Sequence, residues 1–395
     1  MLFRGEFYIL PSFRITADRQ RYSTCNFLTE DDVMKIEILV DSDVFWEDLQ
    51  KEILDAKECV LGQTMSFEGD EVGRMFSETI IQSAAKDKRL LLDSYIRAII
   101  NDRFLYSVKS RRDDALMAEV RATNELIEEN RRAGIQSKFT EPLGFLFHKI
   151  SMRNHKKLVI IDDRIAYIGG INFCDHNFYW HDMMLRIEEL EIVAYLKRDF
   201  ELTWAGKNVG VVKKFGDFTL ITLDKRNNEK LFQPVFNVIE AAQSSVFVES
   251  PYLTFPFIDR LRAAVKRGVE VTICSPDANN WGLMRKYMLW EARRSGFDLQ
   301  LYQGKMSHLK GMLVDEKILI VGSTNYDFLS YRTHIENIAI ICDAGLVEQF
   351  REKVIKPDIA NSRTATAEEL QTNGWLSYGS MKLLEQISRV LKFLP

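Results

Sequence analysis

The stretch NHKKLVIIDDRIAYIGGIN, residues 154–172, decides the fold, because its polar skeleton returns as SHLKGMLVDEKILIVGSTN at residues 307–325. Both copies read His-x-Lys, four residues, Asp, six residues, Gly followed by Gly or Ser, one residue, and Asn. The two histidines, His155 and His308, lie 153 positions apart. Chance rarely repeats a skeleton fixed at so many positions, so we interpret the chain as two related halves.

The spacing of the first copy predicts a local structure. Residues two apart in an extended strand share a face, so His155 and Lys157 should project together. Residues 158–161 and 165–168 are apolar, and Asp162 stands in the acidic turn between them. The second copy has the same pattern. Each copy therefore predicts a buried hairpin that offers His and Lys from one strand and small residues plus Asn after the other.

These residues carry a resemblance to the phospholipase D superfamily, whose two His-Lys-Asp motifs come together in one site. The chain is most similar to bacterial cardiolipin synthases that lack the N-terminal pair of membrane helices. The resemblance covers almost the whole chain. It implies an α/β fold of two pseudo-symmetric phospholipase D-like halves, each a mixed, mostly parallel sheet flanked by helices, packed around one shared active site.

Length, charge and cysteine content set looser bounds. A chain of 395 residues exceeds the size at which a single core usually stops growing. The net charge of −4 gives no overall attraction to nucleic acid or anionic lipid. The five cysteines are scattered without a C-x-x-C pair, which favours a reducing compartment and argues against both disulfides and a thiolate metal site; they are Cys25, Cys59, Cys174, Cys274 and Cys342.

The sequence shows no targeting segment or membrane span. Charged residues and Pro11 interrupt the apolar patches of residues 1–19, and no cleavage site of small residues follows. No uninterrupted apolar run reaches the roughly 18 residues that a spanning helix needs. We therefore expect a soluble or peripheral protein, in the cytoplasm and peripheral to the inner membrane.

The repeat extends beyond the two motifs. Residues 36–67 read as strand, amphipathic helix and strand, and residues 218–255 repeat that order. Helix-then-strand patterns follow in both halves, as expected of parallel βαβ units. We predict an N-terminal half at 1–208 and a C-terminal half at 218–356, joined by a linker at 209–217, with a tail at 357–395.

Three segments distinguish the halves or end the chain. Residues 94–133 form a helical insertion, and residues 139–153 form a shorter one directly before the first motif. Insertions beside a catalytic strand can shape an acyl-chain or head-group entrance, or serve as surface padding. The tail predicts an amphipathic helix that either docks on the fold or contacts a membrane interface; its apolar face comprises Met381, Leu384, Ile387, Leu391 and Leu394.

The resemblance implies a catalytic set made of both motifs: His155, Lys157, Asp162, His308, Lys310 and Asp315. In such a site one imidazole attacks phosphorus and forms a phosphohistidine, while the other protonates the departing alcohol and deprotonates the incoming one. By that resemblance His155 is the nucleophile and His308 the general acid and base, and the roles could be reversed. We read Asp162 and Asp315 as hairpin supports more than as phosphate ligands.

Further residues are predicted to support the phosphate. Asn172, Asn325 and the two lysines would neutralise the diester and its transition state. The small residues Gly169, Gly170, Gly322 and Ser323 would let the backbone approach the phosphate. The resemblance also implies an acid that orients each histidine. By distance along the chain we assign Asp182 to His155 and Glu336 to His308. The remaining histidines, His148, His176, His181 and His334, match no motif position.

The resemblance implies a phosphatidyltransferase of the cardiolipin synthase type, which moves a phosphatidyl group between phospholipid or glycerol alcohols. Its substrates would be phosphatidylglycerol or a similar phospholipid, with neither cofactor nor metal. Two alternatives stay open. One is a hydrolase, either a lipase or a nuclease, although nucleic-acid binding is not expected for a chain without basic stripes. The other is a non-catalytic binding protein, which two intact polar sets argue against.

Overall fold

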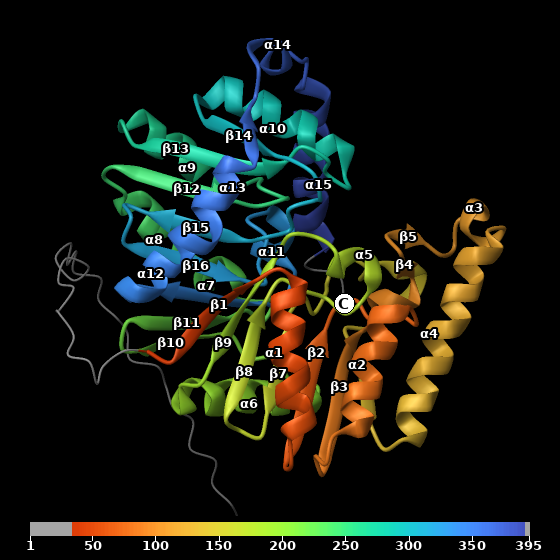
Figure 1. Ribbon diagram of the computed structural model, residues 1–395. Coiled ribbons are helices and arrows are strands. Elements are labelled where there is room, and N and C mark those ends of the chain that lie inside the picture. The colour runs from red at the N-terminus through yellow and green to blue at the C-terminus, as the bar shows by residue number, and fades with distance from the viewer. Residues whose placement is uncertain (1–33, 392–395) are drawn as a thin grey trace, which may run out of the picture. The chain divides into compact units, whose positions relative to one another are not determined.

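The computed structural model describes residues 34–391 and consists of two large mixed sheets flanked by helices (Figure 1). The first sheet has the strand order β1 (Ile36–Val40), β9 (Met183–Ile187), β8 (Ile165–Gly169), β7 (Leu158–Ile161), β2 (Cys59–Thr64), β3 (Asp87–Asp93) and β6 (Gln136–Thr140). Its helices are α1 (Ser42–Asp55), α2 (Glu71–Gln82), α4 (Asp114–Arg132), α5 (Asp175–Phe178) and α6 (Leu190–Trp204).

The second sheet has the strand order β10 (Val211–Phe215), β11 (Phe218–Thr222), β17 (Asn337–Ile341), β16 (Ile318–Gly322), β15 (Gly311–Val314), β12 (Ser245–Glu249), β13 (Glu270–Pro276), β14 (Asp298–Tyr302) and β18 (Ser362–Thr364). Its helices are α7 (Asn228–Leu231), α8 (Gln233–Ala241), α9 (Phe257–Lys266), α10 (Gly282–Ser295), α11 (Phe328–Arg332), α12 (Ala344–Phe350), α13 (Lys356–Ala360), α14 (Ala367–Leu370) and α15 (Trp375–Leu391).

The two sheets correspond strand by strand. The seven strands of the first sheet match, in order and direction, the series from β11 to β14 in the second. The second sheet adds β10 at one edge and β18 at the other. These strands come from the predicted linker and the predicted tail, so both segments belong to the second sheet. The domain boundaries stay a prediction.

The expectation of mostly parallel sheets is wrong. Within residues 34–391 only the series β2–β3–β6 and β12–β13–β14 run parallel, and the other neighbours are antiparallel. The parallel strands are those joined through α2, α4, α9 or α10, because a parallel pair needs a long crossover connection. Among the antiparallel pairs, β7–β8, β10–β11 and β15–β16 are hairpins, whereas β2–β7, β12–β15 and β14–β18 join strands that are distant along the chain.

Each motif is the buried hairpin that its sequence predicts. Strands β7 and β8 pair antiparallel and are buried throughout, and β15 and β16 repeat this arrangement. The turns place two consecutive residues at positive φ, with Asp162 at 50° and Asp163 at 55° in the first. Asp and Asn tolerate this region better than other residues with side chains. Arg164 N donates to Ile161 O at 2.9 Å and closes the turn.

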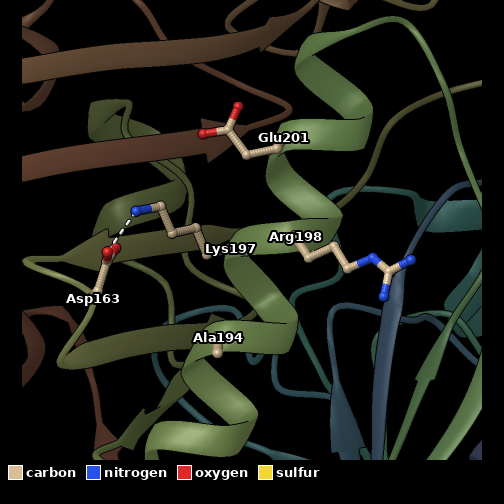
Figure 2. Close-up of a pocket in the computed structure, with 5 residues that line it drawn as sticks. All are labelled: Asp163, Ala194, Lys197, Arg198 and Glu201. Carbon is tan, nitrogen blue, oxygen red and sulfur yellow. Dashed lines mark hydrogen bonds and ion pairs between the residues drawn. The ribbon is translucent and has the colours of Figure 1, made fainter.

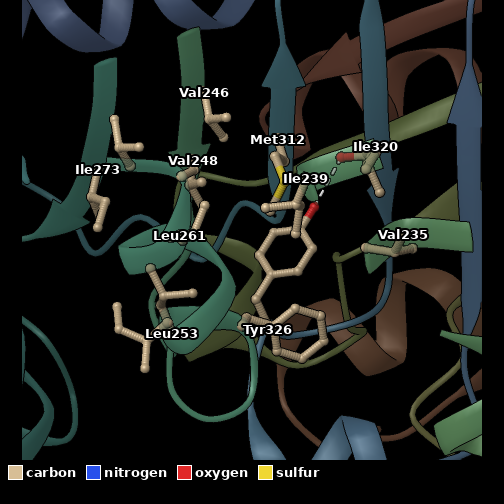
Figure 3. Close-up of a cluster of buried hydrophobic side chains, with 14 of the residues drawn as sticks. Val235, Ile239, Val246, Val248, Leu253, Leu261, Ile273, Met312, Ile320 and Tyr326 are labelled. Carbon is tan, nitrogen blue, oxygen red and sulfur yellow. Dashed lines mark hydrogen bonds between the residues drawn. The ribbon is translucent and has the colours of Figure 1, made fainter. Parts of the chain in front are cut away.

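Three hydrophobic clusters follow the layers. One lies between the first sheet and α1 and α2, and another lies between the second sheet and helices α8, α9 and α10. Figure 3 shows part of the latter, where Tyr326 fills the centre and its hydroxyl donates to Ile320 O at 2.9 Å. The third cluster contains residues of both sheets together with α6 and α12. The two halves therefore share one core.

The longer insertion adds α4 with the short elements β4 (Ile99–Ile100), β5 (Arg103–Phe104) and α3 (Val108–Arg111). Its helix lies where periodicity predicts one, and it buries Leu116 and Leu126. In the shorter insertion, Phe145–Phe147 forms a single 3-10 turn, η3.

The tail helix α15 docks on the fold through Met381, which is fully buried against α10 and its neighbours. Leu384 packs beside it, whereas Ile387 is 43% exposed. Leu394 and the side chain of Leu391 lie outside the described residues. Among residues 34–391, no helix is both long enough and apolar enough to cross a bilayer.

Candidate active site

Main-chain pairing between the halves brings the two motifs together. Asn154 bridges to Ile335, and His181 bridges to Ser307. His155 N donates to Ile335 O at 2.9 Å, and His308 N donates to His181 O at 2.7 Å. Each histidine therefore lies beside the segment that follows the opposite motif.

His308 is held by an acid of the first half. Its Nδ1 lies 2.7 Å from Asp182 Oδ2, and both side chains are almost fully buried. The second oxygen of Asp182 accepts a hydrogen bond from Met183 N at 2.8 Å. Burial by itself would raise the pKa of Asp182, but Lys310 and His308 bring that pKa below its ordinary value. Asp182 is therefore an ionised acceptor that fixes Nδ1–H of His308, and Nε2 makes no hydrogen bond within residues 34–391.

His155 is held by the second half. Its Nδ1 lies 3.0 Å from Ser323 O and 3.4 Å from Glu336 Oε2, and both of these atoms accept hydrogen bonds. Nδ1 therefore carries the proton, and the lone pair is on Nε2. Glu336 also accepts hydrogen bonds from Ser330 Oγ at 2.7 Å and Ser323 Oγ at 3.2 Å. Burial alone would raise the pKa of Glu336, yet His155 and its other partners lower that pKa to about 2.

The assignment of one acid to the histidine of its own half is wrong. Asp182 orients His308, and Glu336 orients His155. The cause is the main-chain pairing, because the bridge of His181 to Ser307 places residue 182 next to residue 308. Spacing along one half cannot reveal this, since the two half-sites exchange their acids across the interface.

Burial sets the protonation of both imidazoles. Burial, and then the charge of Lys157, lower the pKa of His155 to about 3. Burial and Lys310 lower the pKa of His308 to about 4, while Asp182 opposes them. Both rings are therefore neutral at pH 7 in the free protein. An arriving phosphodiester brings negative charge that favours the protonated form.

The two lysines lie in the same pocket and are fully buried. Lys157 Nζ donates to His155 O at 2.9 Å, and Lys310 Nζ lies 2.7 Å from His308 Nδ1 and also donates to His308 O. Burial, followed by repulsion from Lys310, lowers the pKa of Lys157 to about 7. Burial lowers the pKa of Lys310 to about 8. Two buried lysines beside the two imidazoles make the site electropositive at neutral pH, since each is at least half protonated at pH 7.

The structure does not bring the motif aspartates to this pocket. Asp162 accepts hydrogen bonds from the backbone N–H groups of Lys57, Glu58 and Cys59 at 2.8 to 3.1 Å. Asp315 does the same for residues 243–245. A four-residue strand separates each aspartate from its lysine, about 16 Å of extended chain. The two aspartates anchor the hairpin turns to the starts of β2 and β12, so they are structural.

The small residues of the motifs lie beside the two acids, and the asparagines that follow them are buried. A Cβ atom on Gly170 would stand 2.2 Å from Asp182 Oδ1, so only glycine leaves room for that carboxylate. Ser323 occupies the matching position and donates to Glu336 instead. Asn172 Oδ1 accepts from Ser66 N at 3.3 Å. Asn325 Oδ1 is buried and accepts no hydrogen bond among the described residues.

Three further rings surround the imidazoles, and of these only His334 was left without a predicted role. The ring of His334 lies 5.4 Å from that of His155, and His334 Nδ1 lies 3.2 Å from Glu336 Oε1. Trp180 lies 5.0 Å and Tyr252 6.2 Å from the His308 ring, measured between centroids. The proximity of His334 and Trp180 to the two acids in sequence was the available signal.

His181 links the two halves where their main chains pair. Its Nδ1 lies 2.8 Å from Asp41 Oδ1 and its Nε2 lies 2.9 Å from Asp358 Oδ2. Burial opposes its charge, but the two carboxylates raise the pKa of His181 to about 10. An imidazolium that is charged at neutral pH thus links Asp41, directly after β1, to α13 of the second half, next to Asp182.

A shallow hollow of about 340 Å³ lies on α6 and contains the ion pair of Lys197 with Asp163 (Figure 2). Asp163 belongs to the turn of the first motif, at the opposite end of β7 from His155. This hollow therefore has no part in the phosphate pocket.

Two like halves that each supply a histidine and a lysine, and exchange their orienting acids, define a class of enzyme that transfers phosphodiesters through paired His-x-Lys motifs. Comparison with known proteins narrows this class. Residues 49–204 and 235–356 match the family described as "Cardiolipin synthase, PLD-like domain". The chain belongs to this family, as the resemblance of its motifs predicts.

Named relatives and a solved structure agree with this assignment. The chain is 26% identical over 375 residues to cardiolipin synthase 1 of Staphylococcus epidermidis, covering 86% of this chain and 70% of that one. It is 25% identical over 394 residues to the major cardiolipin synthase ClsA of Bacillus subtilis, covering 92% and 75%. Phosphatidylserine synthase of Haemophilus influenzae shares the fold, with a TM-score of 0.64, 16% identity and coverage of 90% and 93%.

Proposed function

We propose that this protein is a phosphatidyltransferase of the cardiolipin synthase type, which moves a phosphatidyl group from one phospholipid to an alcohol of glycerol or of a second phospholipid. The observation that carries the proposal is the pair of buried histidines, each oriented through Nδ1 by a carboxylate of the opposite half. The family match and the named relatives supply the phospholipid substrate class.

The reaction has two balanced steps. In the first, Nε2 of His155 attacks phosphorus, the bond from phosphorus to the donor alcohol breaks, and His308 gives that alcohol a proton. In the second, His308 takes the proton of the acceptor alcohol, whose oxygen attacks phosphorus and releases His155. Lys157, Lys310 and the two asparagines, Asn172 and Asn325, stabilise the charge on the phosphoryl oxygens.

The unequal acids support this division of roles. Asp182 lies 2.7 Å from His308 Nδ1, whereas Glu336 lies 3.4 Å from His155 Nδ1. The tighter ionised partner stabilises an imidazolium more, which suits the group that holds the proton. Water in place of the acceptor alcohol would give the hydrolase alternative with the same residues.

A product assay tests the proposal. Purified protein receives phosphatidylglycerol in mixed micelles, and the products are followed by mass spectrometry. We expect cardiolipin and glycerol in equal amounts, with both lost in His155→Gln and His308→Gln. Phosphatidic acid as the sole lipid product would establish the hydrolase. Cleavage of DNA without any lipid product would establish the nuclease.

Trapping of the intermediate tests the roles of the histidines. Rapid denaturation during turnover and peptide mass spectrometry should find the phosphatidyl group on His155. Its appearance on His308 would reverse the two roles and leave the transferase proposal intact.

We propose that the two insertions form a membrane-facing surface, defined as residues 104–108 and 145–147. Their aromatic rings join, since Phe147 lies 4.7 Å from Tyr106 and 5.4 Å from Phe104. Phe145 is 82% and Leu146 79% exposed, more than any other large apolar side chain among the described residues. Apolar tips beside basic groups suit an anionic bilayer, and the exposed Lys109, Arg111 and Arg112 follow at once.

A cavity of about 600 Å³ lies behind this surface. It is bounded by apolar side chains of the longer insertion and α4, including Ile100, Met117 and Val120, and by the guanidinium-bearing Arg97 and Arg111. Its mixed lining fits a lipid chain with its head group near the arginines. This arrangement supports a work place at the inner surface of the cytoplasmic membrane, where the free thiols Cys59, Cys174 and Cys274 stay reduced.

Vesicle binding tests the surface. Phe145→Ser combined with Leu146→Ser should lower binding to phosphatidylglycerol vesicles while micelle activity persists. Val44→Ser, an exposed apolar residue on α1, is the matched control. Equal vesicle binding by both variants would refute the proposed surface.

A further inference from the structure

A second group of chemically reactive side chains lies outside the phosphate pocket, in the first half. Glu68, Cys174 and His176 come together because Phe67 bridges to Phe173 and Glu68 N donates to Phe173 O at 3.4 Å. This pairing places two segments more than a hundred residues apart side by side. The family chemistry proposed above uses none of these three residues.

The donor atoms of the three residues face one another without hydrogen bonds. A carboxylate oxygen of Glu68, the Cys174 sulfur and a ring nitrogen of His176 all lie within 4.8 Å of each other. His176 Nδ1 is 3.9 Å from Glu68 Oε2, too far for a hydrogen bond. Ligands of a tetrahedral ion bound at 2.0–2.3 Å stand about 3.3–3.8 Å apart, which is close to this spacing.

Glu68 supplies the independent sign of a missing ligand. The residue is only 2% exposed, and its Oε2 accepts no hydrogen bond from the described part of the chain. Cys174 is fully buried. A buried carboxylate oxygen left without a partner is costly, and a cation would satisfy it. Asp70 and Glu119 approach Glu68 within the same limit and add negative charge.

The surroundings match those of metal ligands. Asp102 Oδ1 lies 3.7 Å from His176 Nε2, so a carboxylate stands behind the imidazole. Asn101 N donates to Glu68 Oε1 at 3.1 Å, and Asn280 Nδ2 donates to Asp102 Oδ2 at 3.1 Å. Ligating carboxylates are usually held from behind by such donors, as Glu68 is by Asn101, while Asp102 lies beyond hydrogen-bond distance of the imidazole and contributes negative charge behind it.

In two other groups of potential ligands in residues 34–391 the histidines are already paired with carboxylates. Both ring nitrogens of His181 lie within 2.9 Å of carboxylates. His155 and His334 share Glu336 in the phosphate pocket, where Ser330 and Ser323 also donate to it. Glu249 Oε2 in the His181 group also accepts no hydrogen bond from the described residues, but there both imidazole nitrogens are already taken by carboxylates, whereas both nitrogens of His176 lie at least 3.7 Å from the carboxylates beside them.

We propose that Glu68, Cys174 and His176 bind one divalent transition-metal ion, with Zn²⁺ as the ion whose preference for thiolate, imidazole and carboxylate they fit. The scattered cysteines argued against a thiolate site only because the sequence offers no close pair of cysteines. The ion would fix the segment that leads to Asp182. It would also lie near His308, since Trp180 is 5.6 Å from His176 and 5.0 Å from His308.

Metal binding to the purified full chain tests the site without reference to activity. Metal-free protein is titrated with Zn²⁺ and then with Co²⁺, and bound metal is measured by elemental analysis. We expect one equivalent, and with Co²⁺ a thiolate charge-transfer band in the near ultraviolet. Glu68→Gln, Cys174→Ser and His176→Gln should each weaken binding by at least about tenfold. Cys174→Ser should also remove the band.

Controls separate this site from other thiols and from the phosphate pocket. Cys59→Ser removes a buried thiol of the same half, and His155→Gln removes a donor of the phosphate pocket; both should retain the ion. Failure of wild-type protein to hold one equivalent, or a cobalt spectrum without the thiolate band, overturns the proposal even where a variant does not fold. Zn²⁺ affinity equal to that of the wild type in all three ligand variants overturns the proposal as well. Because the readout is bound metal, a negative result leaves the transferase proposal untouched.

Discussion

Replacing Asp182 by Asn tests the crossed arrangement of acids. The substitution keeps the shape but removes the charge that lies 2.7 Å from His308 Nδ1 and 3.7 Å from Lys310 Nζ. A hydrogen bond to a charged group contributes about 1.5–3 kcal/mol, and each 1.36 kcal/mol is tenfold in rate, so kcat should fall roughly 10- to 150-fold.

The same substitution has a signed effect on pH dependence. Asp182 raises the pKa of His308, whereas burial and Lys310 lower it. Without Asp182 the pKa of His308 falls further, so less of the general acid is protonated at a given pH. The alkaline limb of the kcat profile should therefore move to lower pH.

Nuclear magnetic resonance of ¹⁵N-histidine identifies which ring each acid holds. Asp182→Asn should shift the imidazole signals of His308 and leave those of His155 in place. Glu336→Gln, the matched control, should shift His155 instead. If Asp182→Asn shifts His155 alone, or if kcat changes less than about threefold, the crossed assignment is refuted.

Three further outcomes follow from the site. Asp162→Ala and Asp315→Ala each leave backbone N–H groups without a hydrogen-bond acceptor. The free energy of unfolding should therefore drop by about 1–3 kcal/mol, while kcat of the folded enzyme stays unchanged. Chemical denaturation measures this free energy. Since the pKa of Asp162 is lowered in the folded protein, the difference in stability between variant and wild type should shrink as pH falls through that pKa. A large loss of kcat would contradict the structural role. Gly170→Ala pushes a Cβ atom into Asp182 and should lower kcat at least about tenfold. The control Gly282→Ala meets no atom within 4 Å and should leave kcat unchanged. Equal kcat values for the two variants would show that the Asp182 carboxylate can move aside. Burial is the main cause that lowers the pKa of Lys157 to about 7, so kcat/KM should decline as pH rises through that value. Lys157→Arg should remove this decline, because arginine stays charged. A kcat/KM profile that is flat from about pH 6 to 9 would exclude Lys157 from phosphate binding.

The motif hairpins could be predicted from sequence because their information is local. Apolar runs of four residues around an acidic turn specify β7 and β8, and the repeat specifies β15 and β16. The same logic predicted the strand, helix and strand that open each half. The predicted proportion of parallel strands was wrong, because helix-then-strand patterns indicate only the parallel pairs, while antiparallel pairs, many between distant strands, make up most of both sheets.

What the sequence could not reveal depends on contacts between distant segments. The exchange of Asp182 and Glu336 follows from main-chain bridges between residues more than a hundred positions apart. The same holds for Glu68 beside Cys174. No local spacing rule encodes such pairings, because they arise only when distant segments of the folded chain pack together.

The exchanged acids make the halves interdependent. A fragment that carries only the first motif would keep His155 and lose Glu336, while the complementary fragment would keep His308 and lose Asp182. Neither fragment could place a carboxylate beside its histidine by itself. Two like fragments that associate face to face could restore this contact. A duplicated ancestor that first worked as a symmetric dimer would have left this geometry, and co-expressed halves should regain turnover only upon association.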